Sequence, residues 1–171
     1  MADAHVSVVG EGSRRVGRLT LSAPKTLNSL TLDMVDSLAS QLEAWKSDPT
    51  IAAIFVDGEG EKAFCAGGDV QALRDSSMDK PGGPCVYAET FFAREYRMNH
   101  MLHTYPKPII CWGHGVVMGG GLGILAACSH RVVCERTRIG MPEITIALFP
   151  DVGGSWFLNR MPGHAGRFLA L

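Results

Sequence analysis

Short apolar segments alternate with helical patterns along the chain. Val16 to Leu21 and Ile51 to Val56 are rich in branched apolar residues and are bounded by turn residues, so both are predicted to be strands. Between them, Thr31 can cap a helix that ends at Asp48-Pro49. The apolar positions of this helix recur at helical spacing at Val35, Leu38, Leu42 and Trp45. The pattern therefore predicts strand, helix, strand.

The second of these strands differs from a half-exposed strand. Ile51 to Val56 does not alternate between apolar and polar residues, which favours burial on both faces, as in a parallel sheet. Asp57 to Gly60 is predicted as a turn, and Phe64 to Asp69 leads into a short helix through Leu73. Pro81 to Pro84 then breaks the pattern.

Helix and strand signals continue after this break. A longer helix is expected before Pro106, followed by buried strands at Pro108 to Trp112 and at Arg131 to Glu135. The apolar positions of the helix include Phe91, Tyr96 and Met101. Because strands alternate with helices, the sequence predicts α/β architecture. A length of 171 residues suits one domain, residues 1–171.

Two glycine-rich turns follow apolar strands, at Ala66-Gly67-Gly68-Asp69 and at Met118-Gly119-Gly120-Gly121. Glycine is needed where the backbone approaches a ligand closely or adopts a positive φ. Each turn is predicted to open a helix, where unpaired N–H groups favour negative charge. Two facing turns would form an oxyanion hole, with each donor worth about 3 kcal/mol. The alternative is two tight turns without a ligand, since glycine turns are common.

The second glycine-rich segment has two other interpretations. Ile109 to Cys128 lacks charged residues, as a membrane span does, but its six glycines disfavour a helix of that length. Gly121 to Ala126 fits the nucleotide-binding pattern G-x-G-x-x-A, but eight residues separate Gly121 from the strand end at Trp112. We therefore interpret this segment as a buried strand, a tight turn and the start of a helix.

Two acids stand in apolar surroundings. Glu143 follows a proline, and Asp151 precedes the turn Val152-Gly153-Gly154. Carboxylates in such loops are either paired structurally or held with shifted pKa values for acid–base chemistry. Asp151 could instead cap the following helix. His114 is predicted to be a hydrogen-bonded structural residue rather than a base.

Charge and cysteine content narrow the possible partners. Sixteen basic and 17 acidic residues give a net charge of −1, so no bulk field attracts nucleic acid or an anionic membrane. The five cysteines form no C-x-x-C pair and have no histidine nearby at zinc-ligand spacing, so no metal site is predicted. We expect reduced, mostly buried thiols in a cytoplasmic protein.

The order and spacing of these motifs resemble the crotonase superfamily of enoyl-CoA hydratases and isomerases, and within it the 3-hydroxyisobutyryl-CoA hydrolase branch. The resemblance rests on Lys62 to Asp69, Met118 to Gly123, Met141 to Glu143 and Phe149 to Gly154. Pro24 to Asn28 also resembles the early loop of the family that contacts CoA. The resemblance covers nearly all of the chain from about Val16 onward.

The resemblance implies an α/β, crotonase-like fold of repeated ββα units and a set of residue roles. The N–H groups of Gly68 and Gly120 would hold the thioester oxygen. Glu143 would attack the carbonyl carbon or activate water. Asp151 would orient a substrate hydroxyl or assist proton transfer. Glu95 matches a glutamate that contacts substrate in the hydrolase branch.

One departure from the family pattern bears on the reaction. Family hydratases use two glutamates, and the second would fall at Gly123, which has no side chain. This favours hydrolysis over hydration of an enoyl-CoA, although a hydratase or isomerase and a non-catalytic CoA-binding module remain alternatives. Lys25, Ala66 and Asp69 are also expected to contact the substrate, with Lys25 and then Lys62 as candidates for the CoA phosphates.

Family members continue well beyond 171 residues. Their C-terminal helices help to close the acyl pocket and form subunit contacts. We therefore expect an N-terminal core that lacks those helices and has an open site, with a homo-oligomer as a possible assembly. The expected partner is an acyl-CoA substrate; CoA is part of that substrate, so no separate cofactor is expected.

Overall fold

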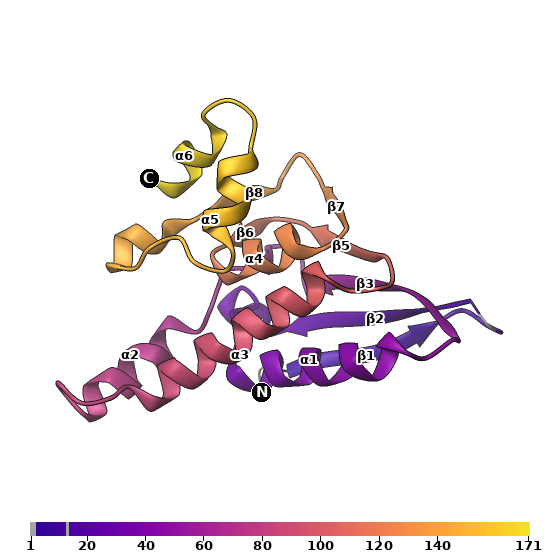
Figure 1. Ribbon diagram of the computed structural model, residues 1–171, viewed down its shortest axis with the longest axis horizontal. Helices are drawn as coiled ribbons and strands as arrows, with labels where there is room; N and C mark the ends of the chain where they lie inside the picture. Colours follow the sequence, from indigo (N-terminus) through magenta and orange to yellow (C-terminus); the bar gives the residue numbers. More distant parts are fainter. Residues whose placement is uncertain (1–2, 13) are drawn as a thin grey trace.

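Two sheets organise the protein, whose computed structural model describes residues 3–12 and 14–171 (Figure 1). The five-stranded sheet has the order β1 (Asp3–Val9), β2 (Arg15–Ser22), β3 (Ile51–Gly58), β5 (Ile109–Gly113) and β7 (His130–Val133). β1 pairs with β2 in antiparallel fashion, and the other pairings are parallel. The second, wholly parallel sheet consists of β4 (Ala63–Cys65), β6 (Val116–Met118) and β8 (Arg138–Gly140). The parallel sheet predicted from the sequence is confirmed.

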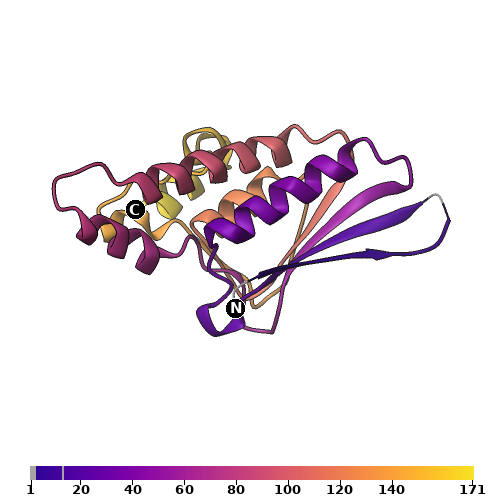
Figure 2. The same cartoon turned by 90° about the horizontal axis from the view of Figure 1, so that it is seen from below.

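The described residues form six α-helices, of which the first and the fourth contact strands of the larger sheet. They are α1 (Leu32–Lys46), α2 (Val70–Asp79), α3 (Val86–His103), α4 (Gly120–Ala127), α5 (Gly154–Phe157) and α6 (Ala165–Ala170), with short 3-10 turns η1 (Pro24–Thr26), η2 (Pro142–Ile146) and η3 (Leu158–Arg160). α1 and α3 run side by side above the strands (Figure 2). The α/β architecture is thus confirmed.

The first helix forms as its sequence pattern predicts. The Thr31 hydroxyl accepts a hydrogen bond of 3.2 Å from the N–H of Met34, which satisfies one of the free amides at the start of α1. Its apolar positions are buried against the sheet at Val35, Leu38, Leu42 and Trp45. The helix ends at Lys46, two residues before Asp48-Pro49.

Two predictions about strands are wrong in part. β3 continues through Asp57 and Gly58, which were predicted to lie in a turn. The Asp57 carboxylate accepts a hydrogen bond of 2.6 Å from the Thr20 hydroxyl on β2, and this holds the strand in register beyond its apolar run. The strand expected at Arg131 to Glu135 is β7, but its residues are exposed because β7 lies at the edge of the sheet.

Other elements have weak sequence signals. α2 extends to Asp79 rather than ending near Leu73; it has no buried residue, so its sequence shows no apolar periodicity. β1 was not predicted, because it is exposed along most of its length. β4, β6 and β8 are three residues each, too short for a strand pattern.

The segment from Ile109 to Cys128 forms β5, a turn at Gly119 and α4, as interpreted from the sequence, and also the short strand β6, which was not predicted. Within residues 3–12 and 14–171, no helix is both long and apolar enough to cross a bilayer. In the same part of the chain, no cluster of three or more His, Cys, Asp or Glu residues could hold a metal ion. Three cysteines are buried and two are half-buried: Cys65, Cys111 and Cys128, and Cys85 and Cys134.

Candidate active site

The two glycine-rich turns lie against each other at the junction of the sheets and helices. Gly67 has a φ of +109°, and a Cβ atom there would lie 3.4 Å from the carbonyl oxygen of Met118 and 3.7 Å from the backbone nitrogen of Gly120. The first turn is fixed to the start of α1, because Leu30 donates a hydrogen bond to Gly67 and accepts one from Asp69. The contacts of such a Cβ atom would be ordinary, so glycine is favoured at position 67 by its positive φ rather than by crowding between the turns.

Gly68 and Gly120 both line one small cavity of about 80 Å³. Among the hydrogen bonds of the described residues, neither N–H group has an acceptor. Gly120 is the first residue of α4, so its N–H is one of the free donors of a helix N-terminus. Two free donors on one cavity suit the binding of a carbonyl oxygen that becomes negatively charged.

Glu143 provides a carboxylate on the same cavity. It lies in η2 and is 7% exposed, and its Oε2 atom is buried without a hydrogen-bond partner among the described residues. A Cβ atom on Gly119 would lie 2.7 Å from Glu143 Oε1, so the carboxylate reaches the second glycine turn. Burial raises the pKa of Glu143, and the nearby Asp151 raises it further.

Glu95 is a second buried acid on this cavity. It projects from α3, is 2% exposed, and its Oε1 atom has no hydrogen-bond partner in the described part of the chain. Burial raises its pKa to about 8, with further contributions from Asp151 and Glu143. The raised pKa favours the protonated carboxyl group, which would be able to donate a hydrogen bond to a ligand.

The raised pKa of Glu95 predicts a pH dependence of stability. Between the unfolded pKa near 4.5 and the folded pKa of about 8, the folded state binds the extra proton. The free energy of unfolding should therefore fall as the pH rises across this window, by up to about 1.4 kcal/mol per pH unit. Thermal unfolding at pH 5, 7 and 9 should show a smaller decrease for Glu95→Gln than for the wild type. Parallel curves for the two proteins would contradict a raised pKa.

Asp151 completes the group of acids and is held by a neighbour on α3. The Tyr96 hydroxyl donates a hydrogen bond of 2.6 Å to Asp151 Oδ2. Burial raises the pKa of Asp151, although this hydrogen bond lowers it. Asp151 does not cap the next helix, because the cap of α5 is Gly153 and no side chain caps it. Tyr96 was predicted from its spacing as an apolar helix position, and its hydroxyl contact was missed.

Gly123 lies one turn into α4, where a family hydratase would have its second glutamate. A Cβ atom there would lie 2.5 Å from the Val152 Cβ atom. Real Cβ atoms do not approach so closely, so a larger side chain at position 123 requires Val152 to move. Residues 16–171 match the protein family described as Enoyl-CoA hydratase/isomerase. The chain belongs to this family.

Curated relatives of the chain carry the name of one hydrolase. The chain is 43% identical over 164 residues to a protein of Danio rerio named 3-hydroxyisobutyryl-CoA hydrolase, mitochondrial. The matched region covers 96% of this chain and 42% of the relative. The chain is 41% identical over 169 residues to the Homo sapiens protein of the same name, with coverage of 99% and 43%. The chain thus spans less than half the length of these relatives. Both names say mitochondrial, so they do not support the expected cytoplasmic location.

Solved structures confirm the family fold. A carnitinyl-CoA dehydratase from Mycobacterium thermoresistibile has a TM-score of 0.87 and 44% identity, over 96% of this chain and 47% of that one. An enoyl-CoA hydratase from Rhodobacter sphaeroides 2.4.1 has a TM-score of 0.88 and 42% identity, over 97% of this chain and 48% of that one. The crotonase-like fold expected from the sequence is therefore confirmed for this part of the family fold.

Only some of the substrate-contacting residues that the family pattern suggested line the cavity of about 80 Å³. Ala66 lines it. Asp69 instead caps α2, where its Oδ1 atom accepts a hydrogen bond of 3.1 Å from the N–H of Ala72. Lys25 and Lys62 line a separate cavity of about 320 Å³. His114 Nε2 lies 2.9 Å from the Gly60 carbonyl oxygen, which agrees with a structural role.

Proposed function

We propose that this protein is an acyl-CoA thioester hydrolase that converts 3-hydroxyisobutyryl-CoA and water to 3-hydroxyisobutyrate and free CoA. The observation that supports the proposal is that Gly68 and Gly120, whose N–H groups have no acceptor among the described residues, line the same cavity as Glu143. The names of the curated relatives support the choice of substrate. The absence of a side chain at Gly123 favours hydrolysis over hydration.

The reaction would begin at the thioester carbonyl. The N–H groups of Gly68 and Gly120 would polarise the carbonyl and stabilise the oxyanion that forms when its carbon is attacked. Glu143 would attack this carbon, expelling CoA thiolate and forming a mixed anhydride, which water then cleaves to release the acid and restore the carboxylate. Alternatively, Glu143 would remove a proton from water as water attacks the carbon directly.

The neighbouring acids would assist rather than attack. Protonated Glu95 would donate a hydrogen bond that helps to position the acyl group. Asp151, held by Tyr96, would orient the substrate hydroxyl or assist proton transfer to the departing thiolate. Lys25, and as a second candidate Lys62, would bind the CoA phosphates from the separate cavity that both residues line.

Product analysis tests this function. We expect the protein to release free thiol from 3-hydroxyisobutyryl-CoA, as detected by a thiol reagent. We expect it to form no hydrated product from crotonyl-CoA. Thiol release requires cleavage of the thioester, whereas hydration leaves it intact. Hydration of crotonyl-CoA without thiol release would replace the proposal with a hydratase. Binding of both thioesters without any turnover would identify a non-catalytic CoA-binding module instead.

A further inference from the structure

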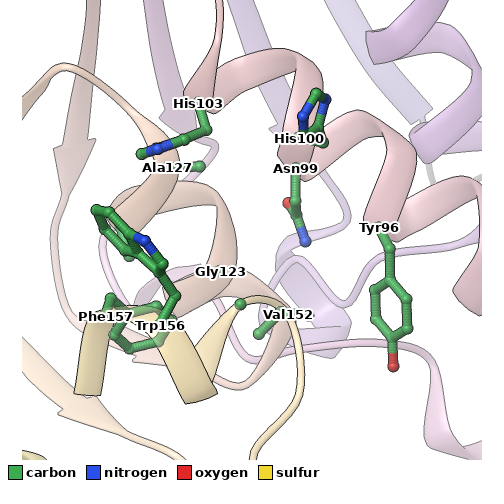
Figure 3. Close-up of a pocket in the computed structure, with 11 residues that line it drawn as sticks. Tyr96, Asn99, His100, His103, Gly123, Ala127, Val152, Trp156 and Phe157 are labelled. Carbon is green, nitrogen blue, oxygen red and sulfur yellow. The ribbon is translucent and has the colours of Figure 1, made fainter. Parts of the chain in front are cut away.

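A second cavity, of about 230 Å³, lies next to the catalytic one (Figure 3). It is bordered by α3, α4 and α5 and by the loop that carries Val152. Most of its wall is apolar, with Ala126, Ala127, Trp156 and Phe157 among the lining residues. Tyr96 and Val152 connect the two cavities, since Val152 lines both and Tyr96 lines this one while bonding to Asp151.

The second cavity lies about one helical turn beyond the catalytic centre. On α3, Asn99 follows Glu95 by four residues; on α4, Gly123 follows Gly120 by three. At about 1.5 Å per residue, these steps are roughly 4.5–6 Å along each helix. A short acyl group whose carbonyl oxygen meets the Gly120 amide would have to extend by about one helical turn, past Val152, to meet Asn99.

Asn99 is the polar group of this cavity that needs a partner. It is 7% exposed, and neither its Nδ2 nor its Oδ1 atom has a hydrogen-bond partner among the described residues. Its amide points from α3 toward Gly123 and Val152 (Figure 3). Leaving a buried amide unpaired is unfavourable, and one hydroxyl group can both donate to Oδ1 and accept from Nδ2. The chemistry of this cavity therefore matches a hydroxyl group.

Val152 forms the division between the two cavities. It has a φ of +42°, a conformation that is strained for a β-branched residue. Its side chain packs against the backbone of Gly123, where a Cβ atom would clash. Such strain is commonly retained at functional sites. An acyl group that extends from the catalytic cavity into the second one would therefore lie against Val152.

The acids that line the catalytic cavity disfavour an acyl group that carries a negative charge. Glu95, Glu143 and Asp151 all border the catalytic cavity that an acyl group must cross. A second carboxylate on the acyl group would be repelled by Glu143 and Asp151 in their ionised forms and would lose its hydration against the apolar wall. A hydroxyl group carries neither disadvantage.

We propose that Asn99 is a specificity residue that binds the hydroxyl group at the end of a short acyl chain. The inference rests on the thioester hydrolase function proposed above and refines it. With the hydroxyl bound by Asn99, Asp151 is left to assist proton transfer.

The test compares two thioesters that differ by one hydroxyl group. We expect the wild-type protein to cleave 3-hydroxyisobutyryl-CoA with a kcat/KM about 10–100-fold above that for isobutyryl-CoA. Asn99→Leu should lose this preference by slowing the hydroxylated substrate while leaving isobutyryl-CoA unaffected or faster. Arg97→Gln, at an exposed position of the same helix, is the control and should retain the preference. Equal slowing of both substrates by Asn99→Leu, or no change in either, overturns the inference.

A binding measurement separates this inference from the proposed function. Thioether analogues of the two acyl-CoA compounds cannot be hydrolysed, so calorimetry reports their affinities directly. If the wild type releases no thiol but still binds the hydroxylated analogue more tightly, and Asn99→Leu abolishes that difference, the hydrolase function fails and the role of Asn99 stands. If the wild type releases thiol but does not distinguish the analogues or the substrates, the role of Asn99 fails and the hydrolase function stands.

Discussion

Replacement of Glu143 by glutamine is expected to lower kcat for release of CoA thiol by about 10²–10⁴-fold, with little change in KM. The amide keeps the size of the carboxylate on the cavity, but it can neither attack the thioester nor accept a proton from water. A steady-state thiol assay with 3-hydroxyisobutyryl-CoA measures the effect. Undiminished turnover in Glu143→Gln would remove this residue from the reaction.

The matched control for this variant is Glu89→Gln. Glu89 is exposed on α3 and does not border the catalytic cavity. We expect its turnover to equal that of the wild type. Equal losses in both variants would indicate a general effect of removing a negative charge, and the assignment of Glu143 would fail.

Replacement of Gly120 by alanine is expected to lower kcat/KM by about 10²-fold. The new methyl group would collide with Glu95 Oε1 and approach the Leu30 side chain to 3.2 Å. The Glu95 carboxyl group can swing away, so the fold should survive, but the space beside the oxyanion donor would be filled. Initial-rate kinetics and a thermal melt of the same preparation measure the two effects separately.

A double variant shows whether this loss acts through Glu95. In a Glu95→Ala background, Gly120→Ala should cause a much smaller further loss, because the colliding carboxyl group is gone. Gly140→Ala is the control, since a Cβ atom there would make an ordinary contact of 3.8 Å with Met118. Full activity of Gly120→Ala, or fully additive losses in the double variant, would contradict the proposed crowding at the oxyanion donor.

The sequence indicated the parts of the site that depend on local backbone chemistry. Gly68 and Gly120 lie in turns whose glycine content is visible directly, and Glu143 and Asp151 stand out as acids among apolar residues. The structure brings all four to one cavity, while their catalytic roles stay predictions. The family resemblance, rather than periodicity, identified Glu95.

The polar residues on the buried face of α3 could not be found from the pattern of the helix. Glu95 and Asn99 occupy positions one turn apart that are buried together with Phe91, Met98 and Leu102. Apolar periodicity predicts the direction of this face, but it does not reveal which cavities the buried polar side chains border. The hydrogen bond from Tyr96 to Asp151 joins residues 55 positions apart, and such long-range pairs depend on the tertiary fold.

The contact between Val152 and Gly123 also constrains how such a chain could change its chemistry over evolutionary time. A glutamate introduced at position 123 alone would collide with Val152, and a smaller residue at position 152 alone would leave an unfilled gap. Each of these substitutions is destabilising by itself. A second acid on α4 therefore requires that positions 123 and 152 change together. The contact between Val152 and Gly123 is therefore a steric barrier to a site with two glutamates, although the backbone fold is the same.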